Sequence, residues 1–386
     1  MNWNWQHPEW PHFTWNAQAL RQAEDRFLTL SGVFTGAFTH LDGEARDELV
    51  IEAMSDEAIT TSAIEGAVLD RGSVQSSIKR QMGLSTIPRQ VRPAERGIAE
   101  MMVSLYQTYT DPLTHETLFQ WHRMVTSGRQ DLEAVGNYRR HSEAMQIVSG
   151  PEYDAQVHYV APPSDRIAAD MGRFIGWFNQ THPAGATPLP AITRAGIAHF
   201  YFEAIHPFED GNGRIGRALA EKALAQGVGH TPLTALAATL LRQRKGYYAM
   251  LERHNCTLEL SVWLRWFAAV VLEAQQHSNQ FIDFLIDKTR LLDRMHGQLN
   301  PRQEKALIRM LQEGPAGFEG GLSAANYISI TGSTPPTTTR DLAGLVDKGA
   351  LLRAGDHRYA RYHLKLPRRE ASRFVIAEDG AIVPHP

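Results

Sequence analysis

The twelve residues 206–217, HPFEDGNGRIGR, bring together residue types that suit chemistry on a phosphate group. His206 carries an imidazole that titrates near neutral pH and can take a proton from a hydroxyl. Asp210 offers a hard carboxylate oxygen, which suits a Mg²⁺ ion that is shared with phosphate oxygens. Arg214 and Arg217 add two cations on neighbouring positions of one helix face. The run therefore predicts a base, a metal ligand and an anion site in one place.

The turn at the centre of this run must position those groups. Gly211 and Gly213 flank Asn212, and glycine allows backbone angles that bring consecutive N–H groups close to a ligand. The residues that follow read as a helix, so the turn should feed a helix N-terminus, where free N–H groups and the helix dipole attract phosphate. Phe208, between polar neighbours, is expected to anchor the loop. Each piece alone is usually structural, and it is the complete order that indicates a site.

The pattern HPFxDGNGRxxR is the signature of the Fic family, and residues 206–217 match it at every specified position. Proteins of that family are typically AMP transferases that move AMP from Mg-ATP to a protein Ser, Thr or Tyr hydroxyl. The resemblance implies ATP as substrate, Mg²⁺ as cofactor and a protein target with a hydroxyl side chain. By position it implies the following roles: His206 as base, Asp210 as metal ligand, Gly211, Asn212 and Gly213 at the α- and β-phosphates, and Arg214 and Arg217 at the β/γ end.

A second motif lies upstream, at the end of a helix expected over about residues 43–66. Gly66 has the position of a C-terminal cap, so Glu65 puts a negative charge in the last turn, where the helix dipole disfavours anions. Taken alone, Glu65 is a tolerated surface residue. However, Ser/Thr-x-x-x-Glu-Gly/Asn resembles the inhibitory motif of Fic proteins, here Thr61, Glu65 and Gly66. The resemblance implies that Glu65 pairs with Arg217 and occupies the place of the γ-phosphate of ATP.

Composition limits the class of protein. The chain has 386 residues, which suggests two or three domains, and a formal net charge of −3, which argues against a protein built wholly around nucleic acid or an anionic membrane. The single cysteine, Cys256, excludes an internal disulfide and a cysteine-rich zinc site. Without an apolar run long enough for a bilayer or a basic-then-apolar N-terminus, we expect a cytoplasmic protein with no membrane partner. The motifs of phosphate-loop hydrolases, zinc proteases and serine hydrolases are absent.

The expected fold class is mainly α: a Fic-type helical bundle with a short β-hairpin flap, plus a C-terminal winged-helix (α+β) domain. Residues 1–105 should hold an N-terminal aromatic strap and the inhibitory helix. The strap contains half of the tryptophans, and we expect it to lie buried against the body, with a partner-docking strip as the alternative. Its large aromatic residues are Trp3, Trp5, Trp10, Phe13 and Trp15.

Residues 106–285 should form the catalytic core. Residues 135–139, 144–148 and 157–160 read as short strands around a turn at Gly150 and Pro151. This region, about residues 135–160, resembles the Fic flap, which docks a target segment by strand addition, and the alternative is a hairpin without function. His122 is expected to be a core or boundary histidine. By resemblance, Tyr248 and Asn255 are the candidates to border the adenine, although an ordinary core aromatic and a helix cap would look the same.

Residues 297–366 read as three helices followed by a hairpin, the order of a winged helix, and residues 367–386 as a C-terminal tail. The segment resembles winged-helix modules appended to some Fic proteins. It could bind DNA, through Arg340, Arg358 and Arg361, or it could mediate a homodimer.

Two alternatives to AMP transfer stay open. The same fold could transfer another phosphate-linked group or remove AMP from a target, in which case Glu65 would orient the attacking water. A different class of function is a nucleotide-sensing regulator that acts on DNA through the winged helix.

Overall fold

The computed structural model describes residues 2–85, 89–149, 156–231, 233–314, 317–318, 320–356, 359–367 and 372–385. Residues 1–278 and 372–386 form one compact unit, and residues 279–371 form a second. Within the described ranges, no helix has both the length and the apolar character needed to cross a bilayer.

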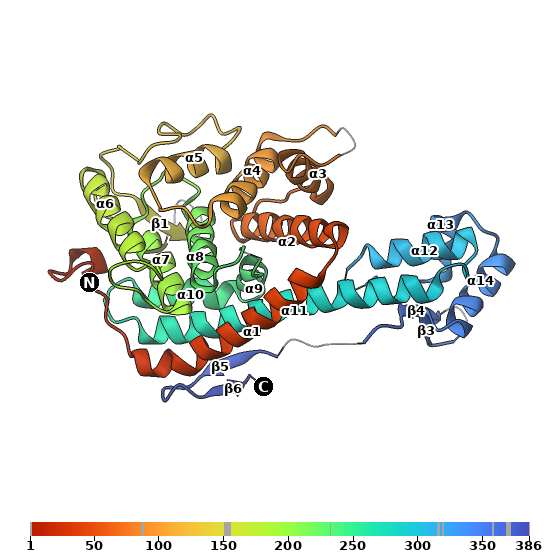
Figure 1. The fold of residues 1–386 in the computed structure, drawn as a ribbon. Coiled ribbons are helices and arrows are strands. Elements are labelled where there is room, and N and C mark those ends of the chain that lie inside the picture. The colour runs from red at the N-terminus through yellow and green to blue at the C-terminus, as the bar shows by residue number, and fades with distance from the viewer. Residues whose placement is uncertain are drawn as a thin grey trace. The chain divides into compact units, whose positions relative to one another are not determined.

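The first unit is mainly helical (Figure 1). Its elements, in chain order, are the 3-10 turns η1 Asn4–Gln6 and η2 Ala17–Leu20, then α1 Arg21–His40, α2 Gly43–Ile64, α3 Arg71–Gln81, α4 Pro93–Thr108, α5 His115–Val125, α6 Ser164–Gln180, α7 Ala191–Ile205, α8 Asn212–Val228, α9 Leu236–Arg242, α10 Arg244–His254 and the start of α11 Ser261–Met295.

Helices α7 and α8 lie at the centre of this unit and carry the residues around the motif. Every residue of α7 except Glu203 is buried, which is the pattern of a core helix rather than of an amphipathic surface helix. Residues of α8 such as Ile215 and Leu219 are also fully buried. The motif is therefore held between two helices that cannot shift without disturbing the core.

The inhibitory helix was expected over about residues 43–66, and α2 spans Gly43–Ile64. Asp42 caps its N-terminus by accepting the N–H of Ala45. Gly66, with φ 84°, ends it in the left-handed conformation that favours glycine.

Of the five large aromatic residues of the strap, Trp10 is buried and the other four are half-buried. Trp10 is buried and meets Tyr201 of α7 edge to face at 5.3 Å. The Trp5 indole N–H donates to the carbonyl of Val160 at 2.7 Å, and the Asn4 N–H donates to that of Asn255 at 2.7 Å. The strap thus joins the base of the flap to the end of α10.

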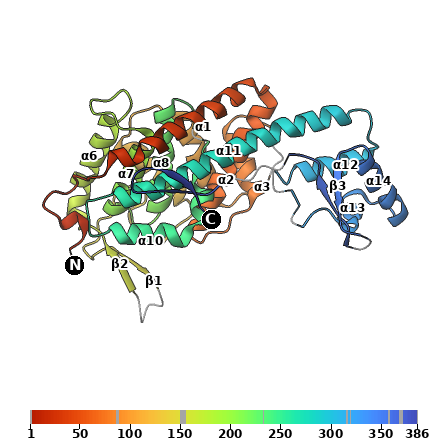
Figure 2. The ribbon, with the colours of Figure 1, turned by 90° about the horizontal axis from the view of Figure 1, so that it is seen from below.

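The flap is an antiparallel hairpin of β1 Gln146–Ser149 and β2 Gln156–Val160, which extends from the helical body (Figure 2). The strand predicted for residues 135–139 was wrong: these residues form a turn and an irregular segment. Gly136 has φ 72°, and the backbone N–H of Arg139 donates to the carbonyl of Pro207 at 2.9 Å, so neither residue is available for a strand ladder. The turn predicted at Gly150 and Pro151 lies outside the described residues.

The C-terminal residues, expected as a tail, form another hairpin of the first unit, β5 Phe374–Ile376 with β6 Ile382–Pro384. The Ser372 N–H donates to Gln276 of α11 at 3.1 Å, and Ile376 is buried.

The second unit contains the end of α11, then α12 Pro301–Leu311, α13 Ala324–Thr331 and α14 Pro335–Asp347, followed by the hairpin of β3 Leu351–Ala354 and β4 Arg361–Leu364. A bridge between Leu322 and Tyr362 adds one more antiparallel pairing to β4. Three helices and a hairpin follow one another in the expected order.

Candidate active site

The motif begins where α7 ends. His206 adopts the left-handed conformation, with φ 50° and ψ 60°, and is the only non-glycine residue with positive φ in the described ranges. This conformation costs about 1–2 kcal/mol for an ordinary residue, so its surroundings must hold it. The His206 N–H donates to Phe202 at 3.0 Å, and its carbonyl accepts from Nε of the buried Arg139 at 2.9 Å.

The imidazole of His206 is 13% exposed, so it reaches the surface of the site without being solvated. Burial lowers the pKa of His206 to about 4, and the charge of Arg139 acts in the same direction. The ring is therefore neutral at pH 7, which is the form that a general base needs.

The loop after His206 is fixed by Phe208, which is fully buried and stacks on His122 with ring centroids 4.2 Å apart. The side chain of Asn212 holds the same residue: its Oδ1 accepts the Phe208 N–H at 3.0 Å and its Nδ2 donates to the Phe208 carbonyl at 2.8 Å. The predicted core role of His122 agrees with its burial and with the Gly136 N–H that its Nδ1 accepts. Because both polar atoms of the Asn212 side chain bond to Phe208, the group of Asn212 that can bind an anion is its backbone N–H.

Helix α8 starts directly after Gly211, whose φ of 84° makes the turn possible, since a side chain there would be strained. The helix has 17 residues, and its first N–H groups have no partner within the helix. The start of α8 therefore offers the predicted anion site.

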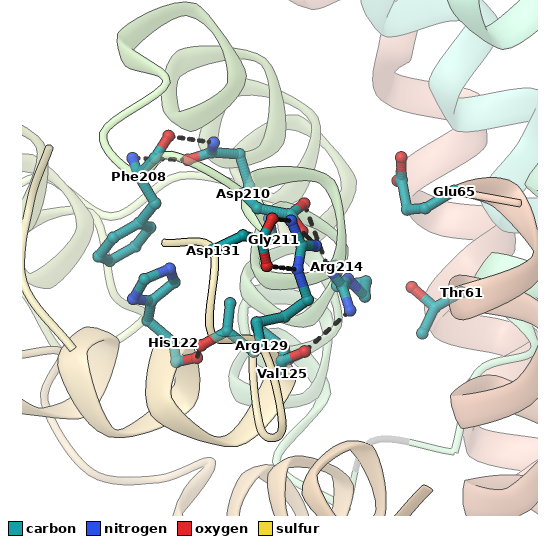
Figure 3. Close-up of polar contacts among 12 residues, drawn as sticks. Thr61, Glu65, His122, Val125, Arg129, Asp131, Phe208, Asp210, Gly211 and Arg214 are labelled. Atoms are coloured by element: carbon teal, nitrogen blue, oxygen red, sulfur yellow. Dashed lines mark hydrogen bonds and ion pairs between the residues drawn. The ribbon is translucent and has the colours of Figure 1, made fainter. Parts of the chain in front are cut away.

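Asp210 lies beside this turn and accepts three donors (Figure 3). Its Oδ1 accepts the Gly211 N–H at 2.6 Å and lies 3.3 Å from Nη2 of Arg214, while its Oδ2 pairs with Arg129. Arg129 also pairs with Asp131. The carboxylate of Asp210 is 34% exposed. Arg214 is fixed further by donating to the carbonyl of Val125 at 2.9 Å.

A Mg²⁺ ion fits this site under one condition. No cluster of three metal-binding side chains occurs in the described part of the chain, so the protein offers one carboxylate, that of Asp210. Mg²⁺ is commonly held by one or two carboxylates together with phosphate oxygens and water, which agrees with such a site. The condition is that the guanidinium of Arg129, which pairs with Oδ2 of Asp210, leaves this oxygen before the ion binds there.

Arg217 is 1% exposed and is held by residues of α2. Its Nε donates to Oγ1 of Thr61 at 2.7 Å, and its Nη2 donates to the Thr61 carbonyl at 2.9 Å and to Oε1 of Glu65 at 2.7 Å. The structure thus brings the two motifs together over the first turns of α8. Figure 3 shows Thr61 and Glu65 projecting from α2.

Glu65 also approaches the backbone of the anion site. A Cβ atom on Gly213 would lie 2.3 Å from Oε1 of Glu65, so the carboxylate occupies the space that glycine leaves open. The carboxylate of Glu65 therefore lies at the place predicted for a phosphate.

Of the two adenine candidates, Tyr248 contacts the end of α2. It is 41% exposed and its hydroxyl donates to the carbonyl of Ile64 at 3.3 Å. Asn255 lies at the end of α10, where its Nδ2 donates to the carbonyl of His158 in the flap at 3.1 Å. The side chain of Asn255 thus ties α10 to β2.

Two residues of the site had no signal in the sequence. In the structure Arg129 and Arg139 lie in irregular segments, although a strand was predicted for residues 135–139, and their partners are 81 and 67 residues away. Only the fold brings them to the motif.

Comparison with known proteins agrees with this geometry. Residues 112–224 match the model of the Fic/DOC family, and residues 3–84 match a domain of unknown function, DUF4172. The chain is 26% identical over 206 residues to "Protein adenylyltransferase Fic" of Drosophila ananassae, over 53% of this chain and 37% of that protein. It is 30% identical over 143 residues to the protein of the same name from Drosophila virilis, over 37% of this chain and 25% of that protein. The matches thus span well under half of these relatives' own length.

Solved structures show the same type of fold. A Fic family protein from Desulfovibrio desulfuricans G20 matches with a TM-score of 0.50 at 19% identity, over 93% of this chain and 99% of that one. A Fic domain containing signalling protein from Bacteroides thetaiotaomicron VPI-5482 matches with a TM-score of 0.51 at 19% identity, over 67% of this chain and 96% of that one. The chain has a mainly helical, Fic-like fold, in which residues 112–224 match the Fic/DOC family model and residues 3–84 match the DUF4172 model.

Proposed function

We propose that this protein is an adenylyltransferase that moves AMP from Mg-ATP to a hydroxyl of a protein, itself included, and that its own helix α2 holds it inactive. The observation that carries the proposal is the contact of Glu65 with Arg217 over Gly213. An acidic side chain bound by a buried arginine at a helix N-terminus marks a place built for anions. The similarity to proteins named adenylyltransferases supports AMP as the transferred group.

The proposed reaction is an in-line displacement at the α-phosphorus. Nε2 of His206 takes the proton of the target hydroxyl, and the oxygen of that hydroxyl forms a bond to the α-phosphorus. The bond from the α-phosphorus to the bridging oxygen breaks, and pyrophosphate leaves with the electron pair. The N–H groups at the start of α8 and the guanidinium groups of Arg214 and Arg217 bind the phosphates and stabilise the charge that develops there.

Asp210 would hold Mg²⁺ after Arg129 releases Oδ2. When bound, the ion would neutralise charge on the phosphate oxygens as a Lewis acid. Arg129 has Asp131 as a second partner, so its charge stays paired during this exchange.

Inhibition follows from the same contacts. While Glu65 and Thr61 hold Arg217, this guanidinium is not free for the end of the triphosphate, and the Glu65 carboxylate repels a phosphate at Gly213. Removing Glu65 should free both the cation and the space.

The activity is tested with ATP, GTP, CTP and UTP, each labelled in the α-phosphate, and the Glu65→Gly variant. We expect label from ATP, and none in the double variant that also carries His206→Ala. Labelling that persists without His206 would overturn the assignment of the base, and labelling from another nucleotide alone would overturn AMP transfer. Release of AMP from a pre-modified target that requires Glu65 would instead identify removal of AMP.

We also propose that residues 297–366 are a winged-helix module that binds DNA. The order of α12, α13, α14 and the β3–β4 hairpin supports this, and Arg340 is exposed on α14. Arg361 is half-buried, and Arg358 lies outside the described residues. A gel-shift series with the upstream region of the protein's own gene, at rising salt, should show salt-dependent binding that Arg340→Ala weakens. No shift at low salt, together with a dimer in solution, would favour the dimerisation role.

A further inference from the structure

We propose that Glu203 is a positioning residue for His206: its carboxylate accepts the N–H at Nδ1 of the imidazole and thereby leaves Nε2 free to act as the base. This inference rests on the function proposed above. It assigns a role to Glu203, which is slightly exposed while every other residue of α7 is buried, and which lies one helical turn before the motif.

The two side chains face each other at the edge of the site. Oε2 of Glu203 lies 3.9 Å from Nδ1 of His206, and the two side chains are 12% and 13% exposed. Over the ranges that the structure describes, Nδ1 of His206 is buried and makes no hydrogen bond of normal geometry, although the backbone carbonyl of Glu203 also acts on the ring. Oε1 of Glu203, the oxygen that faces Gly216, is likewise buried and unpaired. Unpaired buried polar groups are costly, and catalytic hydrogen bonds are often long before substrate binds. A small side-chain rotation would join the two groups.

The motif makes room for this carboxyl group at Gly216. A Cβ atom there would lie 2.6 Å from Oε1 of Glu203 and 3.1 Å from Nδ1 of His199. The imidazole of His199 is held by Tyr247, whose hydroxyl lies 2.8 Å from Nε2. The Glu203 carboxyl therefore has a fixed neighbour on one side and His206 on the other.

The partner of Nδ1 decides which nitrogen of His206 can act. A neutral imidazole carries one proton, and Nε2 accepts a proton only when that proton is on Nδ1. A carboxylate beside Nδ1 selects this tautomer and stabilises the imidazolium that forms when the target hydroxyl gives up its proton. A protonated carboxyl would instead donate to Nδ1 and favour the unproductive tautomer. The charge of Glu203 thus determines how much of His206 is in the tautomer that can accept a proton at Nε2.

Several groups act on this pair. Burial raises the pKa of Glu203 to about 8, Arg217 lowers it and Glu65 raises it. The carboxyl is therefore mainly protonated below that pH and ionises as the pH rises through it. Removal of Glu65 shifts the ionisation to lower pH. The titratable and charged groups that face the pair come from α2, α7, α8, α10 and the loops: Glu65, His199, Arg217, Tyr247, Arg139 and Asp210.

Kinetics in the Glu65→Gly background test the proposal, with AMP transfer measured between pH 6 and 9. We expect a rise of at least about fivefold with a midpoint at or below about 8, and no such rise with Glu203→Gln added. Glu203→Asp should keep the rise at a lower rate. The KM for ATP should stay within about twofold, because Glu203 is not placed to touch the nucleotide. An unchanged rate and pH profile with Glu203→Gln would overturn the proposal.

A second readout needs no activity. ¹⁵N NMR of the His206 ring, with His206→Asn to identify its signals, should show the Nδ1-protonated tautomer growing between pH 7 and 9 in the wild type. The Glu203→Gln variant should show no such change, because an amide does not titrate. A tautomer that responds equally in both proteins would contradict the role of Glu203. If Glu65→Gly transfers no AMP, the proposed function fails while this measurement still decides the question of Glu203.

Discussion

Oε1 of Glu65 lies 2.7 Å from Nη2 of Arg217, although the two residues are 152 positions apart in the chain. The same guanidinium donates to the side chain and the carbonyl of Thr61, one turn earlier on α2. The last turn of α2 and its C-cap residue thus hold the last arginine of the motif. Under the proposed function, α2 must release this guanidinium before Arg217 can bind a nucleotide.

Thr61 should contribute to this hold. Thr61→Val keeps the shape of the side chain but removes the oxygen that accepts from Nε of Arg217, and an unpaired buried donor costs about 1–3 kcal/mol. We expect self-labelling with AMP to rise by about fivefold, the factor for the lower end of this range, and less than with Glu65→Gly, because Glu65 still holds Nη2.

The matched control for this prediction is Thr60→Val, since among the residues that the structure describes the hydroxyl of Thr60 bonds to carbonyls of its own helix. The control should label like the wild type. Equal effects of the two substitutions would mean that helix stability, rather than the contact with Arg217, determines inhibition.

Arg129 should compete with Mg²⁺ for Asp210. Arg129→Ala removes the cation at Oδ2, so less Mg²⁺ should be needed for activity in the Glu65→Gly background. The pair is 43% and 34% exposed, and exposed ion pairs contribute about 0.2–1 kcal/mol, which limits the decrease in the half-maximal Mg²⁺ concentration to about fivefold. Mg²⁺ titrations of the transfer rate measure this change.

Arg96→Ala is the control for the magnesium titration, because Arg96 pairs with Glu100 on the surface of α4. It should leave the half-maximal concentration unchanged. If Arg129→Ala raises the requirement instead, the arginine supports metal or nucleotide binding and does not compete with it.

The sequence was sufficient for the site wherever the signal was local. Both motifs, at residues 206–217 and at the end of α2, are contiguous in the sequence. The residues that cap their helices are also recognisable in the sequence. The strand predicted at residues 135–139 was wrong because the backbone N–H of Arg139 bonds to a distant residue, Pro207. Arg129 and the hairpin at the C-terminus also depend on long-range contacts that no local pattern contains.

The docking of α2 should also respond to pH through Glu57. Both carboxyl oxygens of this buried residue lie 3.0 Å from the N–H of Ala237 at the start of α9, and burial raises the pKa of Glu57. The folded protein therefore keeps a proton that the unfolded chain loses above its ordinary pKa. The contribution of Glu57 to the free energy of unfolding is therefore complete below the pKa of the unfolded chain. It falls as the pH rises from that pKa toward the pKa of the folded state.

Glu57→Gln should flatten this dependence, because the amide oxygen still accepts the Ala237 N–H and does not titrate. Urea unfolding at pH 5 and pH 8 should show a smaller loss of stability for Glu57→Gln than for the wild type. The exposed substitution Glu44→Gln should behave like the wild type. An equal loss in all three proteins would show that Glu57 does not carry the effect.

The most direct test of the account is intact-mass spectrometry after incubation with Mg-ATP, on the wild type, Glu65→Gly and Glu65→Gly with His206→Ala. We predict that added AMP is near background in the wild type, rises by at least about tenfold in Glu65→Gly, and returns to background when His206 is removed. Equal AMP addition in the wild type and Glu65→Gly would contradict inhibition by Glu65, and no addition in either would contradict AMP transfer to itself.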